Sequence, residues 1–263
     1  GLIYIAVMGI SIKRDMQYHI IAFKDVIVSI LAGYMMIPMV LFINNVSMLF
    51  SKNYLEAASQ TLLTYPFVVQ IILMAVIPAL VEEFIFRGLF RKCGVLKGAL
   101  MSGLVFGLFH LNINQFCYAF VIGVVFAFLV EATGSIWSSV LAHFAINTYS
   151  ITIIQLLKIT GTYDTMQEAA GETVVQSSSI SMLLTLAMLL GVSIGFMSLV
   201  YLCIKKMAQH NGRWEYIVND VKSFRVQENA ASEQSVPQQK IMTVPAIVTV
   251  IAVVIYMIVS EIF

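Results

Sequence analysis

Residues 77–87 read Ile77-Pro78-Ala79-Leu80-Val81-Glu82-Glu83-Phe84-Ile85-Phe86-Arg87, two adjacent glutamates and an arginine inside an otherwise apolar run. A charged side chain at the centre of a bilayer costs roughly 2.5–3.5 kcal/mol on insertion scales, so such residues usually face a protein interior or a cavity. The rest of the chain is also apolar, since 60% of its 263 residues are hydrophobic and only 11% are charged. We therefore expect a membrane protein whose helices bury these charges at a functional site.

The apolar runs predict an all-α, polytopic transmembrane bundle. Several of them reach the roughly 20 residues that cross a bilayer as a helix. The eight expected helices cover residues 1–12, 26–50, 62–90, 98–113, 115–131, 135–157, 179–204 and 241–262. The first is too short to cross, so we expect it to be the end of a longer helix that starts before Gly1. We expect residues 1–263 to form a single transmembrane domain, with a helical core at 62–157 and a loop at 205–240.

The basic residues predict how the bundle is oriented in the membrane. Alternate connections hold 13 of the 15 Lys and Arg residues, which leaves only Lys52 and Lys158 on the other side. Because cytoplasmic loops carry an excess of Lys and Arg, the basic side, including the loop 205–240, is expected to face the cytoplasm. Within that loop, helical spacing of Trp214, Ile217 and Val221 predicts a surface helix. The polar stretch 227–239 is expected to be a flexible linker.

Composition excludes two other classes of site. The net charge of +1 gives no basic footprint for nucleic acid. The three cysteines are scattered, so they indicate neither a disulfide framework nor a zinc knuckle. Two Gly-x-x-x-Gly pairs, Gly103 with Gly107 and Gly191 with Gly195, are typical of close helix packing.

Four polar side chains on three expected helices reach one layer of the membrane. At 1.5 Å per residue from the expected cytoplasmic helix ends, Glu82 lies about 15 Å deep, His110 about 20 Å, His143 about 12 Å and Asn147 about 18 Å. Glu83 and Arg87 are four residues apart and can pair on one helix face. That pairing leaves Glu82, turned about 100° away, unpaired.

Such a group can hydrolyse an amide without a covalent intermediate. A carboxylate acts as a general base on water if a histidine orients the same water. A second histidine and an asparagine amide can donate hydrogen bonds to the developing oxyanion. The alternative is a metal site, with Glu82, His110 and His143 as three ligands. The chain lacks a His-Glu-x-x-His motif and Asn147 suits an oxyanion donor better, so we expect no metal and no cofactor.

The same residues resemble the motifs of the CAAX-protease and bacteriocin-processing (CPBP) family of intramembrane glutamic endopeptidases, which includes the type II CAAX prenyl endopeptidases. The three motifs occur in order on separate helices, Glu82-Glu83-x-x-x-Arg87, Phe106-x-x-x-His110 and His143-x-x-x-Asn147. The resemblance covers about 62–157. It implies that Glu82 is the base and His110 its partner on the water. It further implies that His143 and Asn147 are the oxyanion donors, while Glu83 and Arg87 support the site.

Other interpretations of these residues stay open at this point. Glu83 and Arg87 can be a structural ion pair, and the histidines can make ordinary interhelical hydrogen bonds. The runner-up function is a non-proteolytic protein, either a bacteriocin-immunity-like factor or a transporter-associated membrane subunit. As an enzyme, the chain is expected in the bacterial plasma membrane, with its site open to the cytoplasm. Its expected partners are the bilayer and a peptide or membrane-protein substrate, with or without an attached lipid, while the sequence leaves the oligomeric state undetermined.

Overall fold

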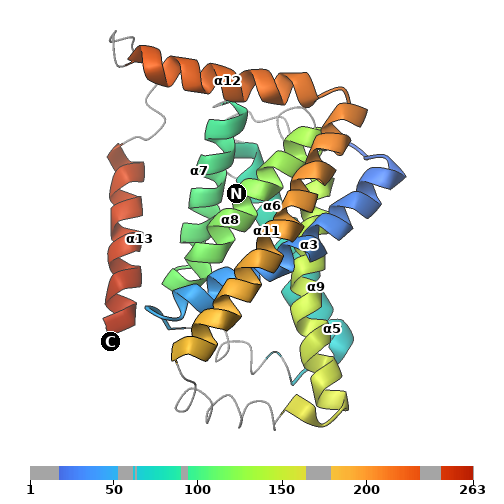
Figure 1. The fold of residues 1–263 in the computed structure, drawn as a ribbon, viewed down its shortest axis with the longest axis vertical. Coiled ribbons are helices and arrows are strands. Elements are labelled where there is room, and N and C mark those ends of the chain that lie inside the picture. The colour runs from blue at the N-terminus through green and yellow to red at the C-terminus, as the bar shows by residue number, and fades with distance from the viewer. Residues whose placement is uncertain are drawn as a thin grey trace.

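The computed structural model describes residues 18–52, 62, 64–89, 94–163, 179–231 and 244–262. The described residues form helices and contain no strand (Figure 1). In chain order the helices are α3 (Phe23–Ser47), α5 (Phe67–Ile71), η1 (Ile72–Val76), α6 (Ile77–Leu89), α7 (Val95–Phe109), α8 (Ile113–Thr133), α9 (Trp137–Ile159), α11 (Ser179–His210), α12 (Trp214–Ala231) and α13 (Val244–Ile262). Within these described ranges, five helical segments are long and apolar enough to cross a membrane. The expected all-α transmembrane bundle is therefore confirmed.

Most of the expected helix boundaries differ from the observed ones by a few residues, and α11 continues to His210 rather than ending at 204. Helix α7 ends at Phe109 rather than at 113, and α8 begins at Ile113. The break arises because the Asn112 side chain caps α8, accepting a hydrogen bond from the Gln115 amide at 2.9 Å. The linker expected at 227–239 is wrong in its first part, since α12 continues to Ala231. The helix expected at 1–12 lies outside the described residues.

The segment that carries the two glutamates is one continuous helix with a wider turn in the middle. Helices α5 and α6 are joined by η1, a π-helical turn at Ile72–Val76. Pro78 lies two residues after the end of η1. A proline has no N–H, and its ring clashes with the carbonyl four residues earlier, here within η1. A π turn relieves this conflict by widening the helix locally. The helix therefore reaches Glu82 and Glu83 without a break.

Glycines let α7 and α8 touch backbone to backbone. A Cβ atom added to Gly123 would lie 2.8 Å from the Cα of Gly103, which no real side chain tolerates. A Cβ atom on Gly107 would meet the Phe116 ring at 3.0 Å. The close packing expected at Gly103 and Gly107 is confirmed. The same expectation is wrong for Gly191 and Gly195, where no described atom lies within 4 Å of the added Cβ.

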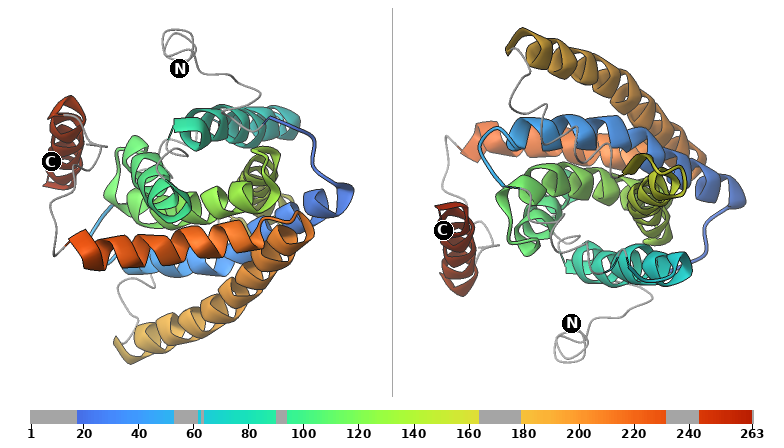
Figure 2. Two further views of the ribbon diagram at one scale, coloured as in Figure 1. Left: turned by 90° about the horizontal axis from the view of Figure 1, so that it is seen from above. Right: turned by 90° about the horizontal axis from the view of Figure 1, so that it is seen from below.

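Helix α12 holds together one end of the bundle. In Figure 1 it runs along the top of the bundle, above the start of α7 and the end of α11. The Asp220 carboxylate accepts a hydrogen bond from the Val95 amide at 2.7 Å, at the start of α7. Arg213 pairs with the Glu131 carboxylate at 2.8 Å, near the end of α8, and Ile217 is buried between these contacts. The views from both ends show α13 standing apart at the edge of the bundle (Figure 2).

Candidate active site

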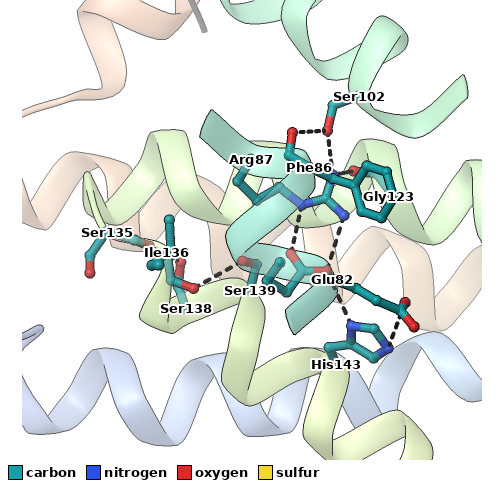
Figure 3. A network of polar contacts seen from close by, with 11 residues as sticks. Glu82, Phe86, Arg87, Ser102, Gly123, Ser135, Ile136, Ser138, Ser139 and His143 are labelled. Atoms are coloured by element: carbon teal, nitrogen blue, oxygen red, sulfur yellow. Dashed lines mark hydrogen bonds and ion pairs between the residues drawn. The ribbon is translucent and has the colours of Figure 1, made fainter. Parts of the chain in front are cut away.

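Glu83 and Arg87 form a fully buried, two-pronged ion pair (Figure 3). Arg87 donates from Nε to Glu83 Oε2 at 2.6 Å and from Nη2 to Oε1 at 3.1 Å. Its Nη1 donates to Ser102 Oγ at 2.6 Å and to the Gly123 carbonyl at 2.9 Å. The expected pair is present, and it is tied to α7 and α8. Sequence reasoning missed Ser102 and Gly123, because a backbone carbonyl has no signature in a sequence.

Glu82 points away from that pair, and its side chain is 21% exposed. Its Oε2 atom is nevertheless buried and has no hydrogen-bond partner among the described residues. The nearest basic atom is Nε2 of His143 at 4.0 Å, which is too long for a hydrogen bond. A buried carboxylate oxygen without a partner is costly. Glu82 is therefore a candidate to bind a group that the protein itself does not supply.

His143 lies between the two glutamates. Its Nδ1 atom is 3.1 Å from Glu83 Oε1, and its Nε2 atom faces Glu82 (Figure 3). An ionised carboxylate only accepts hydrogen bonds, so Nδ1 carries the proton of this contact. Glu83 therefore orients His143 as well as binding Arg87. The sequence reasoning did not foresee this second contact, because α6 and α9 are far apart in the chain.

His110 ends α7 and faces the same cluster. Its Nδ1 atom lies 2.9 Å from the carbonyl oxygen of Phe106, and a carbonyl only accepts, so Nδ1 is the donor. Its Nε2 is thereby left as the ring nitrogen available to another group. The Phe106 ring packs against both histidines, with centroids 5.1 Å from His110 and 5.8 Å from His143. Electrostatic interactions join Glu82 to both histidines.

Leu111 follows His110 with a φ of 54°, the only positive φ of a non-glycine residue in the described ranges. This left-handed residue stops α7 immediately after the histidine. It turns the chain toward Asn112, the cap of α8. The position of His110 at the helix end is thus built into the backbone.

Asn147 is placed less directly than the other candidates. It lies one turn after His143 on α9, half-buried, and makes no hydrogen bond to another described residue. The structure therefore brings Glu82, Glu83, Arg87 and His143 into one cluster, with His110 joined to it through Phe106. No three His, Cys, Asp or Glu side chains converge as metal ligands within the described part of the chain.

A pocket between α7 and α8 reaches the back of this cluster. It has an empty volume of about 290 Å³, including its open mouth, and Gly94 and Glu131 line it near α12. Arg87 and Ser102 line it deeper in the bundle. Glu82 is not part of its wall, so the pocket lies behind the ion pair rather than on the side of the unpaired carboxylate.

Comparisons with known proteins cover the part of the chain that carries this cluster. Residues 64–149 match the family model of the Rce1-like type II CAAX prenyl endopeptidases, and this range contains all six candidate residues. The chain is 32% identical over 91 residues to the "putative membrane peptidase YdiL" of Bacillus subtilis (strain 168). That match covers 33% of this chain and 37% of the relative, so the chain spans little more than a third of that relative's length. No solved structure matches the chain. Residues 64–149 of this chain are therefore similar to the Rce1-like type II CAAX prenyl endopeptidases, a similarity that covers about a third of the chain.

Proposed function

We propose that the chain is an intramembrane glutamate-type endopeptidase that cuts a peptide or membrane-protein substrate. The observation that carries the proposal is the contrast between the two glutamates. Glu83 is fully buried and bonded to Arg87 and His143. Glu82, its neighbour, keeps a buried oxygen with no described partner. A carboxylate whose oxygen makes no hydrogen bond within the fold can accept a proton from water, as a general base must.

The attacking water would lie between Glu82 and His110. Both groups can accept a hydrogen bond there, Glu82 through Oε2 and His110 through Nε2, whose partner nitrogen is occupied by Phe106. Two acceptors would hold both water protons, which directs an oxygen lone pair at the substrate carbonyl. As the oxygen attacks the carbonyl carbon, Glu82 takes one proton. It later returns that proton to the leaving amine, so that the carboxylate is restored.

His143 and Asn147 would stabilise the oxyanion. Because Nδ1 of His143 already donates to Glu83, Nε2 can donate to the oxyanion only when both ring nitrogens carry a proton, so His143 would act here as an imidazolium. The Asn147 amide, one turn further along α9, has no described partner to compete for its protons. One such donor is typically worth about 2.7–4 kcal/mol in the transition state. This mechanism uses no metal and no cofactor.

We further propose that the site opens to the cytoplasm of a bacterial cell, from a single transmembrane domain. Two features support this side. Glu82 lies seven residues before Leu89, the end of α6, or about 10 Å at 1.5 Å per residue. That end adjoins the start of α7, where α12 binds and the basic connections gather. The substrate would approach from there or from the bilayer, with or without an attached lipid.

A comparison of membrane peptides from cells tests the activity. Cells that express wild-type protein and cells that express Glu82→Gln at equal level are analysed by quantitative mass spectrometry of peptide termini. We expect new C-termini only with the wild type, and uncut precursor bound to Glu82→Gln on purification. Identical terminal profiles in the two strains would favour the non-proteolytic roles, an immunity-like factor or a transporter-associated subunit.

A further inference from the structure

Two buried phenylalanine rings contact the same two residues of the site. The guanidinium carbon of Arg87 lies 5.2 Å from the ring centre of Phe106 and 5.7 Å from that of Phe126. The His143 ring centre lies 5.8 Å from Phe106 and 5.4 Å from Phe126. Phe106 is 2% exposed and Phe126 is fully buried. Phe126 belongs to none of the three motifs, and its helix, α8, carries none of the candidate polar residues.

We propose that Phe126 is a positioning residue, which together with Phe106 forms an aromatic clamp around Arg87 and His143. The clamp keeps Nε2 of His143 directed at Glu82 and keeps water away from the ion pair of Glu83 and Arg87. The expected effect of the clamp on turnover rests on the proposed peptidase function. Its effect on the orientation of His143 does not depend on that function.

The hydrogen bonds alone do not fix the orientation of His143. Its ring has one hydrogen bond among the described residues, from Nδ1 to Glu83, and a single bond leaves rotation about its own axis free. The two phenyl rings restrict that rotation from different directions. Phe106 meets the imidazole edge-on at 84°, whereas Phe126 is inclined to it by 36°. A substitution of Phe126 would therefore first change the direction in which Nε2 of His143 points.

The same aromatic clamp also holds Arg87 in place. Its four hydrogen bonds go to Glu83, Ser102 and Gly123, and the two rings lie against the guanidinium. Aromatic faces attract a cation, and more so when the site excludes water. Gly123 and Phe126 are three residues apart on α8 and so share a face. The helix without motif residues thus supplies both a carbonyl and a ring to the site.

The test reads the His143 ring directly, with activity as a second readout. Protein with ¹⁵N-labelled histidine is placed in nanodiscs as wild type, Phe126→Leu and Phe128→Leu, and the His143 signals are assigned with His143→Asn. Phe128 points about 200° away around the same helix and packs against the apolar core, so it controls for the same chemical change. We expect one set of His143 signals, with Nδ1 protonated and bonded to Glu83, in the wild type and in Phe128→Leu. Phe126→Leu should show a second set of His143 signals or exchange broadening.

Turnover should follow the spectra. We expect kcat to fall by about 10- to 100-fold in Phe126→Leu, the scale of a misplaced catalytic group, with KM changed by less than about threefold. Phe128→Leu should keep kcat within about twofold. If the wild type cuts nothing, the proposed function fails, and the spectra still decide the clamp.

Three results would overturn the clamp. One is a Phe126→Leu spectrum identical to that of the wild type. Another is a fall in kcat that merely tracks the melting temperature, as judged by Leu129→Ala, a fully buried core change on the same helix. The third concerns folding: Phe126→Met keeps the apolar volume without the ring, and if neither variant at this position folds, Phe126 is a general core residue.

Discussion

Replacing each of the two adjacent glutamates by glutamine should separate chemistry from stability. In Glu82→Gln the side chain keeps its shape, but an amide cannot take a proton from water. No described hydrogen bond is lost, because the buried Oε2 atom of Glu82 has none. We expect hydrolysis to fall by at least the roughly 10²–10⁴-fold that a general base contributes, while folding and substrate binding persist.

Glu83→Gln should instead lower stability strongly and activity only in part. The carboxylate accepts two hydrogen bonds from Arg87 and contacts Nδ1 of His143, all within a buried site. Breaking a buried pair leaves an uncompensated charge and costs about 3–5 kcal/mol. For a chain of this size, 1 kcal/mol corresponds to about 2–4 °C in melting temperature, so the expected fall is roughly 6–20 °C. Some activity should remain, because the base itself is still present.

The assay measures melting temperature and turnover of both variants and the wild type in the same nanodiscs. Turnover is measured well below the lower melting temperature, so that unfolding does not enter the rates. The reasoning is refuted if Glu83→Gln is as stable as the wild type but inactive, while Glu82→Gln stays active. In that case Glu83 would be the base.

Three further expectations follow from the proposed mechanism and orientation. Asn147→Ala should lower kcat by about 10²–10³-fold with little change in melting temperature, as measured with the variants above, because it removes one oxyanion donor and no described hydrogen bond. Activity should survive EDTA and phenanthroline, and loss that zinc restores would instead favour a metal mechanism. In intact cells a membrane-impermeant thiol reagent should label Thr162→Cys but neither Lys97→Cys nor Lys222→Cys, and labelling of Lys222→Cys from outside would reverse the orientation.

The bundle itself was predictable from the sequence because hydropathy acts along the chain. Apolar runs long enough to cross a bilayer have few options other than a helix, since lipid offers no partners for backbone groups. Each helix expected in the described ranges is present, and five helical segments there are long and apolar enough to cross a membrane. The pair of Glu83 with Arg87 was also predictable, because a spacing of four places both residues on one face of any α-helix.

Boundaries that depend on single side chains were less predictable. The break between α7 and α8 depends on the Asn112 cap and on the left-handed Leu111. Leucine is not typical of left-handed turns, so the sequence does not predict this one. The extension of α12 to Ala231 runs through a polar stretch, which reads as a linker when no partner for the helix is known.

The contacts that build the site were decided only by the tertiary structure. Glu83 and His143 are 60 residues apart, and Arg87 and the Gly123 carbonyl are 36 apart. Whether such groups meet depends on how closely the helices pack, and here two glycines bring α7 and α8 into contact. The ring of Phe126 acquires its neighbours in the same way. A sequence states which side chains are available and which share a helix face, whereas the distances between faces come from packing the whole bundle.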